Sequence, residues 1–136
     1  MPDRRAQLSL SVVEATLGLL FVVAVATGFT LSPPDPGVEE TQLDHYAGDV
    51  GRLLAHEPAP NARTSLLAVA SRSPERFVTV RETLRERTDD ALPATVLYRV
   101  ETPQGAVGYR PPDGVPVGRA TVPTLAGQVT IRVWYA

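Results

Sequence analysis

The sequence predicts an α+β protein in which a transmembrane helix precedes a small outer domain with two helices and a C-terminal antiparallel sheet. Three observations predict this fold. The chain begins with a nearly uncharged apolar run, continues with apolar residues at helical spacing, and ends with alternating β-branched and aromatic residues. The predicted divisions are a basic leader (1–6), the transmembrane helix (7–31), a Pro-rich linker (32–38) and the outer domain (39–136).

The first element is the apolar run from Ala6 to Leu31, in which Glu14 is the only charged residue. A helix of this length would measure about 39 Å, enough to cross a hydrocarbon core of about 30 Å. Arg4 and Arg5 precede the run, and no basic residue follows it closely. The positive-inside rule then predicts a single-pass protein of the cell membrane, in contact with lipid, with a cytoplasmic N-terminus and an extracytoplasmic C-terminal domain.

Two other interpretations of this run remain open. Ala24-Val25-Ala26 has the small-residue pattern of a secretory cleavage site, so the run could be a signal that is removed. It could also be a core helix buried inside a soluble protein. Within a helix, Ala24 and Gly28 form a small-xxx-small pair that permits close helix packing. Glu14 would either lie near the helix end or pair with a positive group on a neighbouring helix.

The outer domain begins with helical patterns. Leu43, Tyr46, Val50, Leu53 and Leu54 recur at helical spacing within a predicted helix over 39–57, and prolines at 58 and 60 end it. Residues 64–70 suit either a short helix or a strand. A second helix is expected from Pro74 to about Thr88, with Ser73 as its N-cap and with Phe77, Val80 and Leu84 on one face.

Strand patterns fill the rest of the chain. Residues 94–102 and 106–110 predict a hairpin that turns at 103–105, and 120–122 and 128–135 predict a second pair around Ala126-Gly127. In the last strand, Val129, Ile131, Val133 and Tyr135 form the expected core face. Trp134 alternates with them and is expected at an edge or an interface.

Composition excludes several functions. The chain has no cysteine, so it has no disulfide and no thiolate chemistry. All basic residues are arginine, and the net charge of −2 leaves no basic face for nucleic acid. His45 and His56 lie about 16 Å apart along one predicted helix, too far to share a metal ion. Asp89-Asp90 is typical of a helix end. No catalytic fingerprint is present, so the sequence predicts a non-enzymatic protein without a cofactor.

The N-terminus resembles a known family. Arg4-Arg5-Ala6-Gln7-Leu8-Ser9-Leu10 followed at once by an apolar helix is similar to the start of archaeal type IV pilin-like proteins and archaellins. The resemblance implies that a prepilin peptidase cuts the bond between Ala6 and Gln7. A second register, with cutting after Ser9, would place Glu14 at the fifth position of the mature chain. The whole pattern also resembles small pilin-like or secretion-accessory proteins of salt-loving archaea.

The resemblance implies a structural role. The expected function is a membrane-anchored, pilin-like structural or assembly component of the cell envelope, which contacts other proteins through its helix and its outer domain. The alternative is a monomeric binding or accessory module, either single-pass or exported.

Overall fold

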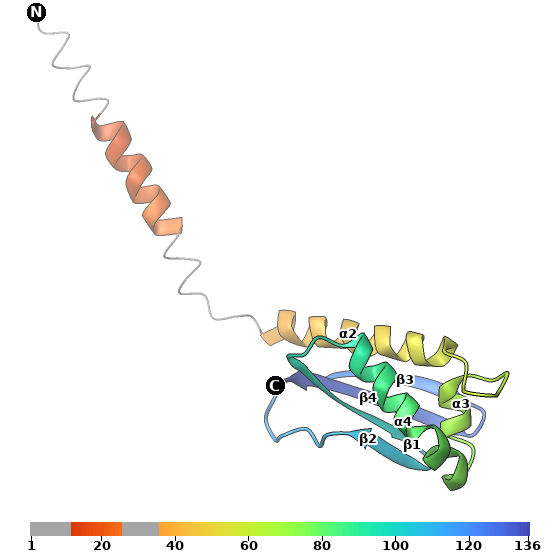
Figure 1. Ribbon diagram of the computed structural model, residues 1–136. Coiled ribbons are helices and arrows are strands. Elements are labelled where there is room, and N and C mark those ends of the chain that lie inside the picture. Colours follow the sequence, from red (N-terminus) through yellow and green to blue (C-terminus); the bar gives the residue numbers. More distant parts are fainter. Residues whose placement is uncertain (1–11, 26–35) are drawn as a thin grey trace, which may run out of the picture. The chain divides into compact units, whose positions relative to one another are not determined.

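The computed structural model describes residues 12–25 and 36–136 (Figure 1). The chain divides into two compact units, Met1–Asp35 and Pro36–Ala136. In the first unit, residues 12–25 form a helix. The second unit contains three helices and a four-stranded antiparallel sheet, so its fold is of the α+β class.

The sequence predicted a transmembrane helix over residues 7–31, and the structure contradicts this prediction. None of the helices within residues 12–25 and 36–136 combines the length and the apolar character that a membrane crossing requires. The single-pass membrane localisation and the extracytoplasmic placement of the C-terminal domain were inferred from that helix, so these two predictions are corrected with it.

Several residues that supported those predictions lie outside the described part of the chain. They are Arg4 and Arg5, which set the predicted orientation, the processing pair Ala6 and Gln7, and Gly28 of the small-residue pair. Residues 32–35 of the predicted linker lie outside it as well.

The first helix of the folded unit is α2, Pro36–His56. It begins three residues before the predicted helix, because proline is tolerated in the first turn, where its missing N–H has no helical partner. Leu43, Val50 and Leu54 are buried along one face, as the spacing predicted. Leu53 was also expected on that face, but it is 41% exposed, because it lies beyond the edge of the apolar stripe.

Two shorter helices follow. Residues 64–70, which suited either structure, contain the helix α3, Leu66–Ala70. The helix α4 spans Pro74–Ala91, and the Ser73 side chain accepts a hydrogen bond from the Arg76 N–H at 3.2 Å, which confirms the predicted N-cap. Phe77, Val80 and Leu84 are buried on one face of α4, also as predicted.

The strands are β1 (Val96–Thr102), β2 (Gly105–Gly108), β3 (Gly118–Thr124) and β4 (Gly127–Tyr135). They pair in the order β2-β1-β4-β3, and every pair is antiparallel. The two predicted hairpins, β1-β2 and β3-β4, are confirmed. The pairing of β1 with β4 joins them into one sheet.

The helices cover one face of this sheet (Figure 1). Successive side chains of a strand point to opposite faces, so alternate residues of β1 and β4 point toward the helices. The core includes Leu43, Val50, Leu54, Leu66, Phe77, Leu84, Val100, Val129, Ile131 and Val133. The opposite face of the sheet carries Arg99 and Glu101 of β1 and Thr130 and Arg132 of β4, all half-buried.

The sequence predicted Trp134 at an edge or an interface, but the structure places it in the interior of the sheet. Its strand β4 is central in the sheet, between β1 and β3, and the side chain is only 1% exposed. It lies on the face opposite the helices, directly across from Leu97 of β1. The indole Nε1 is buried and has no hydrogen-bond partner among the described residues.

Gly118 lets α2 approach β3 closely. A Cβ atom at this position would collide with the backbone carbonyl of Leu43 in α2. The neighbouring Arg119 N–H donates a hydrogen bond to the Asp44 carboxylate at 2.9 Å, so helix and strand are joined at the same place. Gly118 is also the first residue of β3, so the strand begins at this close contact.

We expect the substitution Gly118→Ala to lower the free energy of unfolding by about 1–3 kcal/mol, because the methyl group must displace the backbone of α2. Urea denaturation followed by circular dichroism measures the change. The control is Gly48→Ala in the middle of α2, where the added Cβ meets no other atom. This control should raise stability by up to about 1 kcal/mol. Equal effects from the two substitutions would contradict the close contact at Gly118.

Candidate functional site

Two features of the described residues stand out as candidate interaction sites. One is the helix of residues 12–25, and the other is a group of charged side chains on the open face of the sheet. The two features lie in different compact units, and each is described by itself.

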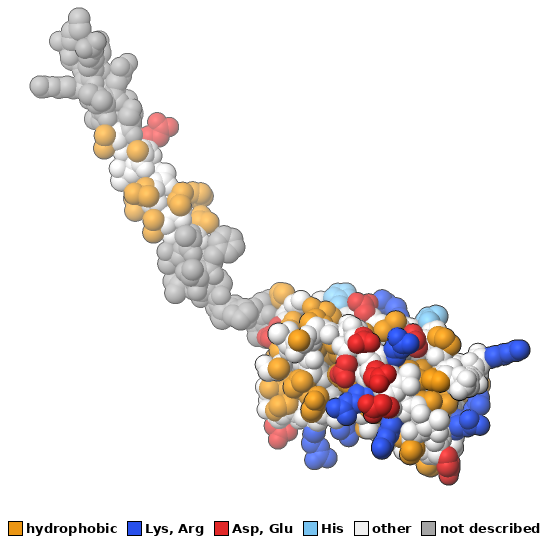
Figure 2. Space-filling model, in the orientation of Figure 1, with side chains coloured by type: hydrophobic (Ala, Val, Ile, Leu, Met, Phe, Trp, Pro, Cys, Tyr) orange, Lys and Arg blue, Asp and Glu red, His pale blue; other side chains and the backbone are white. Residues whose placement is uncertain are grey.

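The helix of residues 12–25 exposes large apolar side chains along its whole length. Val13, Leu17, Leu20 and Phe21 are each more than half exposed, and Phe21 reaches 71%. Figure 2 shows hydrophobic side chains along the visible face of this helix. A helix that is apolar all round is usually covered by other apolar groups.

Two of the predicted site residues fall within this helix. Glu14 and Ala24 are both exposed. Within residues 12–25 and 36–136, no ion pair involves Glu14, and its pairing with a positive group on a neighbouring helix stays a prediction. Ala24 lies near the end of the described helix, and its predicted partner in helix packing lies beyond it.

The second feature is a row of arginines across three strands. The strand register places Arg99 of β1 opposite Arg132 of β4, and Arg132 opposite Arg119 of β3. Like charges directly across a sheet repel one another. Glu101 reduces this repulsion, because it lies two residues from Arg99 on the same face of β1.

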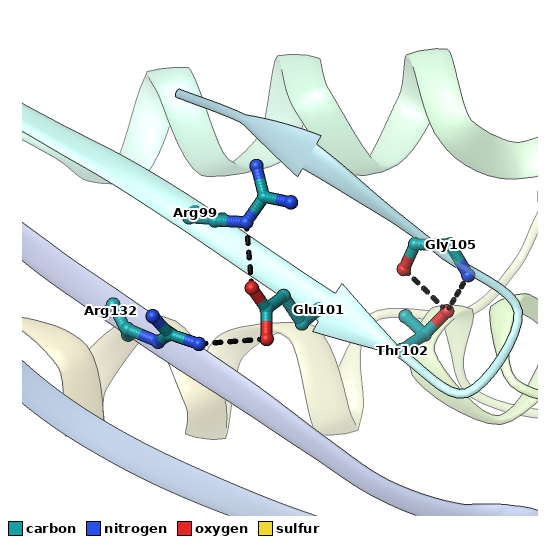
Figure 3. A network of polar contacts seen from close by, with 5 residues as sticks. All are labelled: Arg99, Glu101, Thr102, Gly105 and Arg132. Atoms are coloured by element: carbon teal, nitrogen blue, oxygen red, sulfur yellow. Dashed lines mark hydrogen bonds and ion pairs between the residues drawn. The ribbon is translucent and has the colours of Figure 1, made fainter. Parts of the chain in front are cut away.

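Glu101 binds two of the three arginines (Figure 3). Its Oε1 accepts a hydrogen bond from Arg99 Nε at 2.7 Å, and its Oε2 accepts one from Arg132 Nη2 at 2.9 Å. The hydrogen bond from Arg99, together with the positive charges of Arg132 and Arg99, outweighs partial burial and lowers the pKa of Glu101 from its ordinary value of 4.5. The carboxylate is therefore ionised at neutral pH.

Two arginines of this row, Arg99 and Arg132, border a hollow of about 560 Å³. Arg99, Glu101 and Arg132 line it from the sheet, and residues 110–113 of the loop between β2 and β3 line it from the side. This loop contributes Arg110 and Asp113. Three guanidinium groups and two carboxylates therefore surround the hollow.

A smaller hollow of about 280 Å³ lies near the end of α4. Asp89, Tyr98 and Tyr109 are among its lining residues. The Tyr98 hydroxyl donates a hydrogen bond to the Arg85 carbonyl at 3.2 Å. Burial, and next the neighbouring Asp89, raise the pKa of Tyr98 well above its ordinary value. Tyr98 therefore stays neutral and serves as a donor.

The histidines lie apart from both features. His45 and His56 are exposed on α2, and His56 Nδ1 lies 2.8 Å from the Arg52 carbonyl oxygen. Within residues 12–25 and 36–136, no group of His, Cys, Asp or Glu side chains could hold a metal ion. Asp89 and Asp90 lie in the last turn of α4, as the sequence predicted.

The arginine row was not predicted from the sequence. Each strand does carry a signal, because Arg99 and Arg132 occupy the polar positions of alternating strands. These arginines form a group because of the register between β1, β4 and β3. The alternation of residues within a single strand does not specify that register.

The fold and these features define a small α+β protein with an open, arginine-bearing sheet face and a separate apolar helix. Residues 4–135 match a family of unknown function, DUF7262, and the chain belongs to this family. No curated protein and no solved structure matches the chain.

We expect Glu101→Gln to lower the free energy of unfolding at neutral pH by about 1 kcal/mol, because two partly buried ion pairs are weakened. A depressed pKa contributes stability above the ordinary value of 4.5, and that stability is lost as the pH falls through the lower folded-state pKa. The difference between wild type and variant should therefore shrink in acid.

Urea denaturation at neutral and acidic pH measures this difference. Glu86→Gln, at an exposed position on α4, provides the control. A difference for Glu101→Gln that stays constant with pH would show that the carboxylate charge contributes nothing to stability.

Proposed function

We propose that this chain is a non-enzymatic, pilin-like structural or assembly component that associates with other protein subunits through the helix of residues 12–25. The observation that carries the proposal is the exposure of large apolar side chains on this helix. The resemblance of residues 4–31 to the start of type IV pilin-like proteins supports it.

The helix of residues 12–25 has little stability by itself. An isolated helix of this length is marginal in water, and most helical stability in proteins comes from packing of an apolar face. The folded unit, residues 36–136, has a core of its own and is a separate compact unit. Apolar side chains from other subunits would cover the helix and stabilise it.

Glu14 fits this proposal as a specificity element. A carboxylate brought into an apolar interface is costly unless a positive or hydrogen-bonding group meets it. A neighbouring subunit that supplies such a group would align the two helices at a defined register.

A second candidate function is a monomeric binding or accessory module. The arginine-lined hollow on the open face of the sheet favours it, because this hollow can bind a ligand without any contribution from the apolar helix. The two candidate functions differ in whether the chain assembles through its apolar helix or acts as a monomer.

We expect Leu17→Glu and Phe21→Glu each to abolish association of the full-length chain, because either substitution would bury a charge in the interface. Sedimentation velocity, combined with chemical crosslinking, measures the distribution of sizes. Val78→Glu is the matched control, because Val78 is also an exposed apolar residue but lies on α4 of the folded unit.

The expected result is a discrete assembly for wild type and for Val78→Glu, and monomers for the two helix variants. A monomeric wild-type chain would contradict the assembly proposal and favour the binding module. Assemblies that persist in both helix variants would place the interface elsewhere.

The processing step gives a separate prediction. If the chain is handled like a pilin, a prepilin peptidase removes residues 1–6, and the mature protein begins at Gln7. Mass spectrometry of the protein from its native cells measures this terminus, and Ala6→Asp should block the cut. A mature protein that begins at Thr27 would instead indicate secretory cleavage, and an intact leader would indicate that no processing takes place.

A further inference from the structure

We propose that the hollow on the open face of the sheet is a binding site for an oxyanion, a carboxylate or a phosphate group carried by a partner molecule. This inference does not depend on the helix of residues 12–25. It would hold whether the chain assembles or acts as a monomer.

Charge is the first argument. Arg99, Arg110 and Arg132 line the hollow against Glu101 and Asp113, so the site is positive although the whole chain has a net charge of −2. Arg119 adds a further positive charge across from Arg132, and its exposed side chain has no ion pair within the described residues. The local surplus would attract an anion.

Free hydrogen-bond donors are the second argument. Arg99 uses its Nε and Arg132 uses one terminal nitrogen to bind Glu101, and Figure 3 shows the terminal nitrogens of Arg99 pointing away from that carboxylate. Arg132 Nε is buried and has no partner in the described chain. A guanidinium group carries five N–H donors, and its planar fork matches the oxygens of a carboxylate or a phosphate.

Preorganisation is the third argument. The Arg99 and Arg132 side chains are only 27% and 28% exposed, and Glu101 holds both of them. Side chains that are already fixed lose little conformational entropy when a ligand binds. Pro111 and Pro112 restrict the backbone of the loop that lines the hollow from the side.

The site suits a single anionic group better than a nucleic acid strand. An extended phosphate backbone requires positive charge along its length, whereas these arginines gather around one hollow. The face that carries the helices mixes both signs of charge, and Figure 2 shows acidic and basic side chains interspersed on the side in view.

The test measures thermal unfolding of the full-length chain with increasing inorganic phosphate or succinate, at constant ionic strength. Trp134 is the only tryptophan and lies on the same strand as Arg132, so its fluorescence reports unfolding of the sheet. Either anion, if it binds, should raise the midpoint by about 5 °C at about ten times its dissociation constant. A rise with phosphate alone identifies a phosphate site, and a rise with succinate alone identifies a carboxylate site.

Three substitutions test whether the rise comes from the hollow. Arg99→Gln and Arg132→Gln should each weaken binding by about tenfold or more, because each removes charged donors. Arg76→Gln is the control, because Arg76 is an exposed arginine on α4, and the rise should be unchanged. Circular dichroism verifies folding, and two independent variants keep the test valid if one of them unfolds. No rise with either anion, or an equal rise in all four proteins, would overturn the proposal.

Discussion

The packing of α2 against the sheet is the contact on which the folded unit depends. Leu43, Val50 and Leu54 are fully buried in this contact, and Gly118 lets the backbones of helix and strand approach each other. Because the helices cover one face of the sheet, alternation along each strand sends polar side chains to the other face. A slip of one residue in β4 would bring Arg132 into the core, so the same packing also fixes the arginine row.

Periodicity was sufficient to predict much of the folded unit. The helices, the Ser73 N-cap and the two hairpins could be predicted from the sequence, because each depends on residues that are close together in the chain. Trp134 was misplaced for the opposite reason. Its burial follows from the central position of β4, which depends on pairing with β1 about thirty residues away in the sequence. The Arg99–Glu101–Arg132 group was not predicted for the same reason, because these side chains come together only when β1 pairs with β4.

The N-terminal segment shows the limit of hydropathy. An apolar run indicates that a helix needs apolar surroundings, but it does not specify whether lipid or protein provides them. The transmembrane prediction assumed that lipid provides them, but no helix within residues 12–25 and 36–136 is both long and apolar enough for a crossing. Cover by protein is the basis of the proposed assembly, while the oxyanion site on the sheet would serve a different contact.

Hydrogen–deuterium exchange of the full-length chain tests the central claim, that association covers the apolar helix. The amides of residues 12–25 should exchange slowly at high protein concentration and rapidly after dilution, because only the associated chains protect them. The amides of β1 and β4 should stay protected at both concentrations, since their cover lies within the folded unit. Rapid exchange of residues 12–25 at every concentration, or protection that does not change on dilution, would contradict the account.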